Sequence, residues 1–195
     1  MIQNTDSKKR NTGLEFKIRK IYNEKEWKKG GRQMEIERRF YIEDLSNIDL
    51  SKYEKKIIIQ DYLYRDGMTA IRKRKIIDNK EEKYFYTIKT NKVGISVNEI
   101  ESIITKKEYD KLELNSSYKT ISKTRYIIPY IEGLKIELDV FLEDFEGLVF
   151  AEIEFKSEEQ ANSIELPDWF GKEVSTKITN VQMITMTKEE VLNLI

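Results

Sequence analysis

The sequence predicts an α+β fold in which successive antiparallel hairpins make up most of a 195-residue chain. From Met34 onward, short runs rich in Ile, Val, Tyr, Phe and Thr recur, separated by turn residues such as those around Asn79 and Gly94. Within many of these runs, charged side chains repeat two residues apart, which is the period of a strand. A chain of this length can form one domain with a sizeable core.

Eight strands and three helices are expected in order along the chain. The strands are predicted near residues 34–42, 55–64, 68–77, 82–90, 95–104, 119–129, 131–141 and 147–156. Capping boxes, in which Glu or Gln follows Ser or Thr by three residues, indicate where the helices begin. The capping pairs are Thr105 with Glu108, Ser157 with Gln160, and Thr187 with Glu190. The helices are predicted near residues 106–114, 158–164 and 178–195, and a break within the last one is left open.

Residues 1–33 differ in charge from the rest of the chain. They hold ten Lys/Arg and four Asp/Glu, a net charge of +6, although the complete chain balances 35 basic with 35 acidic residues. Because this segment shows no sustained hydrophobic period and ends near the Gly30-Gly31 pair, it is predicted to be a flexible tail before a domain at 34–195. An electrostatic arm for nucleic acid, an acidic membrane or a polyanion is the alternative interpretation of the same charges, and a start of the protein at Met34 is a further one.

The chain contains neither Cys nor His. This excludes disulfides, thiolate nucleophiles, Cys/His zinc sites and Ser-His-Asp catalysis. Any chemistry must use carboxylates, Lys, Arg, Tyr and hydroxyl groups, and a metal would have oxygen ligands of the kind that Mg²⁺ or Mn²⁺ prefers. No apolar run is long enough to cross a membrane and no secretory signal is visible, so a cytoplasmic protein without membrane contact is expected.

Charged pairs at the strand period are sorted by sign. The acidic pairs are Glu35/Glu37, Glu99/Glu101, Glu137/Asp139 and Glu152/Glu154, and the basic ones are Arg72/Arg74 and Lys123/Arg125, with Arg39 and Lys89 alongside. For a single strand, a core face and a solvated face explain such a pattern. Over seven strands, the sorting suggests that the sheet closes and that the charged faces line a lumen. Its carboxylates suit a hard cation and its basic groups suit phosphate, whereas a nucleic-acid surface would carry fewer acids.

The order of these motifs resembles a known family. Glu35-Ile36-Glu37-Arg38-Arg39-Phe40 is similar to the ExExK signature that opens the CYTH domains, also called triphosphate tunnel metalloenzymes. Further matching motifs follow in the family's order, among them Ile71-Arg72-Lys73-Arg74, Thr87-Ile88-Lys89, Glu99-Ile100-Glu101, Lys123-Thr124-Arg125 and Ala151-Glu152-Ile153-Glu154. The resemblance covers residues 34–180. It implies an eight-stranded antiparallel barrel, flanked by the three helices, whose tunnel holds a divalent metal and a triphosphate.

The resemblance also implies a role for each motif residue. The implied metal ligands are Glu35, Glu37, Asp139, Glu152 and Glu154. The implied phosphate-binding residues are Arg39, Arg72, Arg74, Lys89, Lys123 and Arg125. The implied catalytic residues are Glu99, Glu101 and Glu137, which would position water or a second metal, and Tyr62, as a hydrogen-bond partner.

Three departures from the family pattern make the basic lining thinner. Arg39 stands where the family has Lys, Val97 stands where Arg is frequent, and the stretch at 175–179 is shortened. The expected function is metal-dependent hydrolysis of tripolyphosphate or a related triphosphate, ATP and thiamine triphosphate included. A class IV-type adenylyl cyclase acting on ATP and a non-catalytic sensor of polyphosphate or nucleotide are the alternatives. A homodimer is a further expectation.

Overall fold

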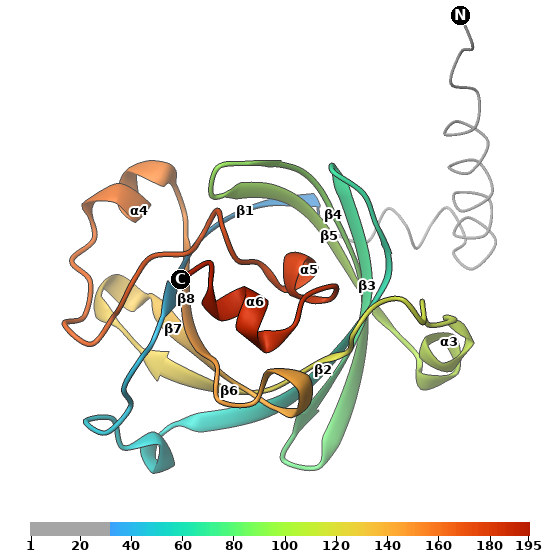
Figure 1. Ribbon diagram of the computed structural model, residues 1–195, viewed down its shortest axis with the longest axis horizontal. Coiled ribbons are helices and arrows are strands. Elements are labelled where there is room, and N and C mark those ends of the chain that lie inside the picture. The colour runs from blue at the N-terminus through green and yellow to red at the C-terminus, as the bar shows by residue number, and fades with distance from the viewer. Residues whose placement is uncertain (1–31) are drawn as a thin grey trace, which may run out of the picture. The chain divides into compact units, whose positions relative to one another are not determined.

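The computed structural model describes residues 32–195. The predicted tail lies outside the described residues, apart from Arg32 and Gln33, whose backbone begins the first strand. As predicted, eight strands form a closed antiparallel barrel (Figure 1). Their order around the barrel is β1-β5-β4-β3-β2-β6-β7-β8. The strands are β1 (Arg32–Tyr41), β2 (Glu54–Arg65), β3 (Thr69–Asp78), β4 (Glu81–Val93), β5 (Ser96–Ile104), β6 (Ile121–Pro129), β7 (Lys135–Phe141) and β8 (Val149–Phe155).

Short helices occupy the connections and the C-terminal segment. They are α3 (Lys106–Lys111), α4 (Glu158–Ser163), α5 (Asn180–Met183) and α6 (Lys188–Leu192), with 3-10 turns η1 (Leu50–Lys52), η2 (Ile131–Gly133) and η3 (Glu143–Phe145). The predicted helix at 178–195 is divided in two, because separate capping boxes at Thr179 and Thr187 start α5 and α6. β7 begins at Lys135, later than the predicted start near residue 131, because Ile131–Gly133 forms η2 first and Gly133 has a positive φ of 73°.

An apolar cluster covers the outside of the barrel over β1, β6, β7 and β8. Ile36, Leu138 and Ile153 are among its buried members. The cluster is completed by Ala161 of α4 and by apolar residues of the loops that follow β1 and α4. Because alternate residues of a strand point to opposite faces, burying these side chains outside directs the charged residues between them into the barrel.

The C-terminal residues 174–195, called here the C-terminal plug, close one end of the barrel. Seen in Figure 1, α5 and α6 lie within the ring of strands. Val174, Ile178 and Met183 of the plug pack on Phe141 and Phe150 in a second apolar cluster. The last predicted helix therefore fills a barrel end and does not cover an outer apolar face. Within residues 32–195, no helix is both long enough and apolar enough to span a membrane.

Candidate functional site

The charged faces of the strands meet inside the barrel. Strand pairing sets Arg39 opposite Glu152 and Glu37 opposite Glu154, and neighbouring pairs follow the same pattern around the barrel. An inner cavity of ≈ 170 Å³ lies at this level. Its lining is polar throughout: Glu35, Glu37, Gln60, Arg72, Arg74, Lys89, Glu99, Glu101, Lys123, Arg125, Glu137, Glu152, Glu154 and Asn180. Twelve of these fourteen belong to the predicted site, so the period-two pattern located most of the lumen.

Glu35, Glu37 and Glu154 form the acidic trio of the tunnel. Carboxylate oxygens of the three residues lie within 4.8 Å of one another. Burial and the neighbouring Glu152 raise the pKa of Glu37 to about 7. Burial and Glu35 raise the pKa of Glu154 to about 8. Among the described residues, Lys89 on Glu35 is the one basic side chain in a salt bridge with the trio, which leaves negative charge that a cation can neutralise. Three converging carboxylate oxygens fit a hard divalent cation, so the residues present agree with the predicted magnesium or manganese site.

The other two predicted metal ligands, Asp139 and Glu152, lie among cations. Asp139 is fully buried and pairs with Lys123 and with Arg125, whose Nε is 2.6 Å from Asp139 Oδ1. Glu152 lies 3.3 Å from Arg39 Nε and 2.6 Å from Arg125 Nη2. Burial alone would raise the pKa of Glu152, but Arg39, Lys123 and Arg125 outweigh it and hold this pKa well below its usual range. Both carboxylates are thus counterions of basic side chains in this arrangement, and Glu152 also neighbours Glu37 of the acidic trio.

Lys123 and Arg125 form a cationic pair on β6, in which the Lys123 side chain is almost fully buried. Burial and the adjacent Arg125 lower the pKa of Lys123 to about 8, against the opposing effect of Asp139. Arg125 reaches three carboxylates, those of Glu137, Asp139 and Glu152. Its guanidinium is therefore held in a fixed orientation by charge-assisted hydrogen bonds.

The remaining predicted phosphate contacts lie on β3 and β4. Lys89 pairs with Glu35 and lies 2.9 Å from Glu99. Arg72 lies 3.7 Å from Glu99. Arg74 donates to Glu101 at 2.5 Å, and Thr87 donates to the same carboxylate at 2.8 Å. Each cation on this wall faces a carboxylate on β5 or β1, so the lumen carries its own counterions.

The predicted catalytic carboxylates Glu99, Glu101 and Glu137 therefore face basic side chains and do not form one cluster. Glu99 pairs with Lys89, Glu101 with Arg74, and Glu137 with Arg125. Burial opposes ionisation of Glu99, but Lys89 and Arg72 outweigh it and lower its pKa. Glu99 is thus charged at neutral pH and can accept hydrogen bonds.

Arg39 and Tyr62 occupy the end of the lumen next to the C-terminal plug. Arg39 is almost fully buried, donates to the Ile178 carbonyl at 3.3 Å and to Asn180 Oδ1 at 2.8 Å, and stacks over the Phe150 ring at 4.4 Å. Tyr62 Oη accepts from Gln60 Nε2 at 3.1 Å. Arg39 and Tyr62 therefore have different hydrogen-bond partners. Arg39 joins the lumen to the plug.

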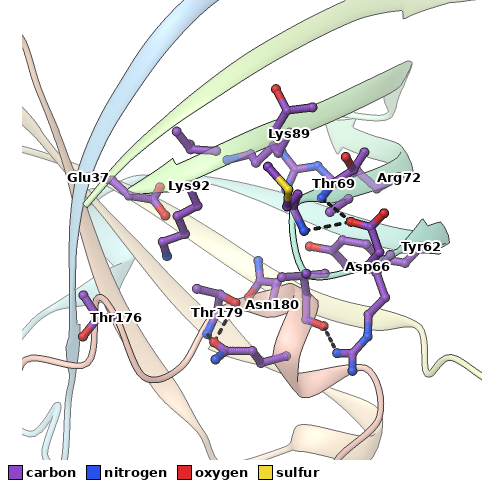
Figure 2. A pocket seen from close by; sticks show the side chains of 18 of the residues that line it. Glu37, Tyr62, Asp66, Thr69, Arg72, Lys89, Lys92, Thr176, Thr179 and Asn180 are labelled. Atoms are coloured by element: carbon purple, nitrogen blue, oxygen red, sulfur yellow. Dashed lines mark hydrogen bonds between the residues drawn. The ribbon is translucent and has the colours of Figure 1, made fainter. Parts of the chain in front are cut away.

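A larger cavity of ≈ 620 Å³, called here the mouth cavity, lies next to the inner one. It shares Glu37, Arg72 and Lys89 with the inner cavity and extends between the plug and the β2–β3 and β4–β5 hairpins. Figure 2 shows Glu37 and Lys92 side by side on one wall of this cavity, with Asn180 and Thr179 of the plug below. The predicted site did not include Lys92 or Asn180, because neither lies at an inward position of a regular strand.

The comparisons with known proteins now identify the family. An inorganic triphosphatase of Acetivibrio thermocellus is 34% identical over 142 residues, which span 72% of this chain and 85% of that enzyme. The chain belongs to the inorganic triphosphatase family. An inorganic triphosphatase of Nitrosomonas europaea is 36% identical over 92 residues, 47% of this chain and 60% of that enzyme, so this match spans under two thirds of the relative. No model of a protein family matches the chain.

Solved structures agree with this membership. The crystal structure of the inorganic triphosphatase NE1496 aligns with a TM-score of 0.53 at 26% identity, over 78% of this chain and 95% of the other. The PH1819 protein of Pyrococcus horikoshii shares the fold, with a TM-score of 0.52 at 24% identity over 66% of this chain and 82% of the other. The prediction of a triphosphatase, and hence of a hydrolase, is confirmed at the level of the family.

Proposed function

We propose that this triphosphatase hydrolyses inorganic triphosphate bound inside the barrel, with Mg²⁺ or Mn²⁺ as cofactor. The observation that carries the proposal is the acidic trio beside a wall of Arg and Lys within one closed lumen. A tripolyphosphate chain needs both positive side chains and a metal to balance its charge, and the lumen offers groups for each. Membership of the inorganic triphosphatase family supports the choice of substrate.

Glu35, Glu37 and Glu154 would hold the metal, since their oxygens already converge. A divalent metal in such a site polarises phosphoryl oxygens and stabilises charge that develops in the transition state. Asp139 and Glu152, also predicted as ligands, lie on Lys123, Arg125 and Arg39 and would act as counterions that orient these cations.

Arg72, Arg74, Lys89, Lys123 and Arg125 would bind the phosphate oxygens. Phosphoryl transfer asks a protein mainly for positioning and electrostatic stabilisation, so cations fixed in advance lower the cost of reorganisation. The carboxylates that now hold them are Glu99, Glu101, Glu137, Asp139 and Glu152. Phosphate oxygens can replace part of these contacts because both are anionic acceptors of similar geometry.

Glu99, Glu101 and Glu137 would position the attacking water. Glu99 suits this role best, since Lys89 and Arg72 lie beside its Oε2, and these cations lower its pKa and keep it charged. An ionised carboxylate of this kind accepts a hydrogen bond from water and holds its oxygen toward the phosphorus. Tyr62, held by Gln60 at the plug end, would be a hydrogen-bond partner of the substrate.

The test is phosphate release from tripolyphosphate by the purified protein with Mg²⁺, Mn²⁺ or EDTA. We expect release with either cation and none with EDTA. A Glu37→Gln variant should be inactive under all three conditions, which excludes a contaminating phosphatase. Wild-type protein that releases no phosphate with either cation would contradict the proposal.

The mouth cavity favours one second candidate, a triphosphate that carries an organic group. Its ≈ 620 Å³ falls within the range of small-molecule sites, and Met68, Ala70, Val97 and Val181 add apolar surface to its lining. ATP or thiamine triphosphate are such compounds. Chromatography of the products from ATP separates hydrolysis from cyclisation, and it also tests the cyclase alternative. A non-catalytic sensor, a homodimer and a cytoplasmic location stay predictions.

A further inference from the structure

A β-bulge near the end of β4 turns Lys92 toward the tunnel. Up to Thr90 the strand pairs regularly with β5, with Lys89 opposite Glu99 and Thr90 opposite Asn98. The register then shifts, and the next pair joins Val93 to Ser96. Two residues of β4 therefore lie opposite one residue of β5. Counted from the inward-facing Lys89, the period of two would place Lys92 on the outer face, but a bulge of this kind re-aims the side chain.

The re-aimed side chain lies at the wall of the mouth cavity. Lys92 lines this cavity together with Glu37 and Glu152, and Figure 2 shows its side chain next to Glu37. Lys92 Nζ donates a hydrogen bond of 3.1 Å to the backbone carbonyl of Ser175 in the plug. An ammonium group has three N–H donors, so two remain to bind a ligand in the cavity.

Lys92 makes no direct ion pair within the described part of the chain, and the acidic groups that face it, Glu37 and Glu152, act on its charge from beyond salt-bridge distance. Among residues 32–195, no carboxylate oxygen lies within 4.0 Å of its ammonium group, whereas Arg39, Arg72 and Lys89 each have one. Val97 is the β5 residue opposite the bulge, and its side chain adds no charge to this wall of the cavity. Partial burial lowers the pKa of Lys92, and an anion placed in the mouth cavity would favour its charged form.

We propose that Lys92 binds the outermost phosphate of the substrate where the tunnel opens into the mouth cavity, and so fixes how far the chain enters the lumen. The proposal rests on the proposed hydrolysis of triphosphate. It makes Lys92 a substrate-binding residue that the strand pattern assigns to the wrong face. Its ammonium, already oriented by Ser175, extends the row of cations formed by Arg72 and Lys89 up to the mouth.

The experiment compares Lys92→Met, Lys92→Arg and a matched control, Lys83→Met. Lys83 is an exposed residue of the same strand and lines neither cavity. In steady-state assays with tripolyphosphate and Mg²⁺, Lys92→Met should raise KM about tenfold with kcat changed less, because a charge-assisted hydrogen bond to phosphate is lost. Lys92→Arg should restore most of the loss, and Lys83→Met should match the wild type.

Two results would overturn the proposal. One is a wild-type KM for Lys92→Met. The other is a lowered Tm for Lys92→Met together with equal losses of kcat and kcat/KM in Lys92→Met and Lys92→Arg, which would assign Lys92 to holding the plug through Ser175. If the wild type itself does not turn over, the proposed function has failed. Calorimetric titration of the same variants with tripolyphosphate and Mg²⁺ then decides the role of Lys92, with a tenfold weaker Kd expected for Lys92→Met alone.

Discussion

Lys123 and Asp139 form an ion pair that is almost completely removed from solvent, with side-chain exposures of 2% and 0%. Arg125 bonds to the same carboxylate from the side. Removing a buried charge leaves its partners uncompensated, which costs more than the pair itself contributes. The pair therefore links the stability of the barrel to the cations that we propose for substrate binding.

Replacing Asp139 by Asn should lower the free energy of unfolding by about 3 kcal/mol, because the buried Lys123 loses its counterion and Arg125 loses one of its three carboxylates. Urea denaturation followed by circular dichroism measures this loss. The matched control is Asp110→Asn, which breaks the exposed pair with Lys106 and should cost under about 0.5 kcal/mol. Equal losses in the two variants would show that Asp139 does not neutralise the buried cations.

Glu35→Gln and Glu37→Gln should each abolish metal-dependent turnover and leave the barrel folded. Each substitution removes one charged oxygen donor from the acidic trio. Phosphate release measures the turnover, and thermal unfolding in EDTA confirms the fold. Full activity in both variants would refute the assignment of the metal site.

The metal-free protein should lose stability as the pH rises, owing to Glu37 and Glu154. Their folded pKa values of about 7 and about 8 lie above the ordinary value of 4.5, so the folded state binds additional protons. The stability from these protons is complete below about pH 4.5 and is lost as the pH rises through the folded pKa values.

Mg²⁺ should therefore raise Tm more at about pH 8.5 than at about pH 5.5, since it competes with protons for the same oxygens. Thermal unfolding with Mg²⁺ or EDTA at both pH values provides the measurement. In Glu154→Gln the Mg²⁺-induced shift should shrink at both. A shift that is independent of pH in the wild type would contradict the prediction.

Arg39→Lys should loosen the C-terminal plug. Lysine keeps the charge beside Glu152 but cannot donate to both Ile178 and Asn180 or stack on Phe150 in the same way. We expect a loss of about 1–2 kcal/mol in the free energy of unfolding and faster proteolysis after Lys177. Unchanged proteolysis would mean that Arg39 serves the substrate alone, as the sequence predicted.

Neutralising Arg72 and Arg74 together should raise KM for tripolyphosphate by about 100-fold or more, because two charge-assisted contacts are lost. Lys75→Met is the control on the outer face, where Lys75 pairs with the exposed Glu82. Lys73 is a poorer control, since its ammonium is buried and bonds to the carbonyls of Tyr109 and Leu112. Similar KM changes for the double variant and Lys75→Met would mean that the strand faces are reversed.

The sequence predicted the lumen well because a strand has a strict period. Glu35, Glu37 and Glu154 follow from that period, and their strands neighbour each other in the closed barrel. The period does not predict the position of Lys92, because the bulge arises from the pairing of β4 with β5. That pairing cannot be inferred from the sequence of β4 alone. The distinction between Asp139 and the acidic trio also depends on pairing, since only the register of β6 and β7 brings Arg125 against Asp139.

The pairing of β1 with β8 also has a consequence for how the chain folds. The barrel closes only when β1 pairs with β8, which brings Ile36 opposite Phe155. Contacts this distant in sequence form slowly, because the entropy of a long loop is lost before they contribute. Until then β1 and β8 each have an unpaired edge, which can pair with another chain. A chain that ends before Val149 would lack β8 and would keep the edges of β1 and β7 open, and we expect it to aggregate during synthesis and leave no monomeric barrel.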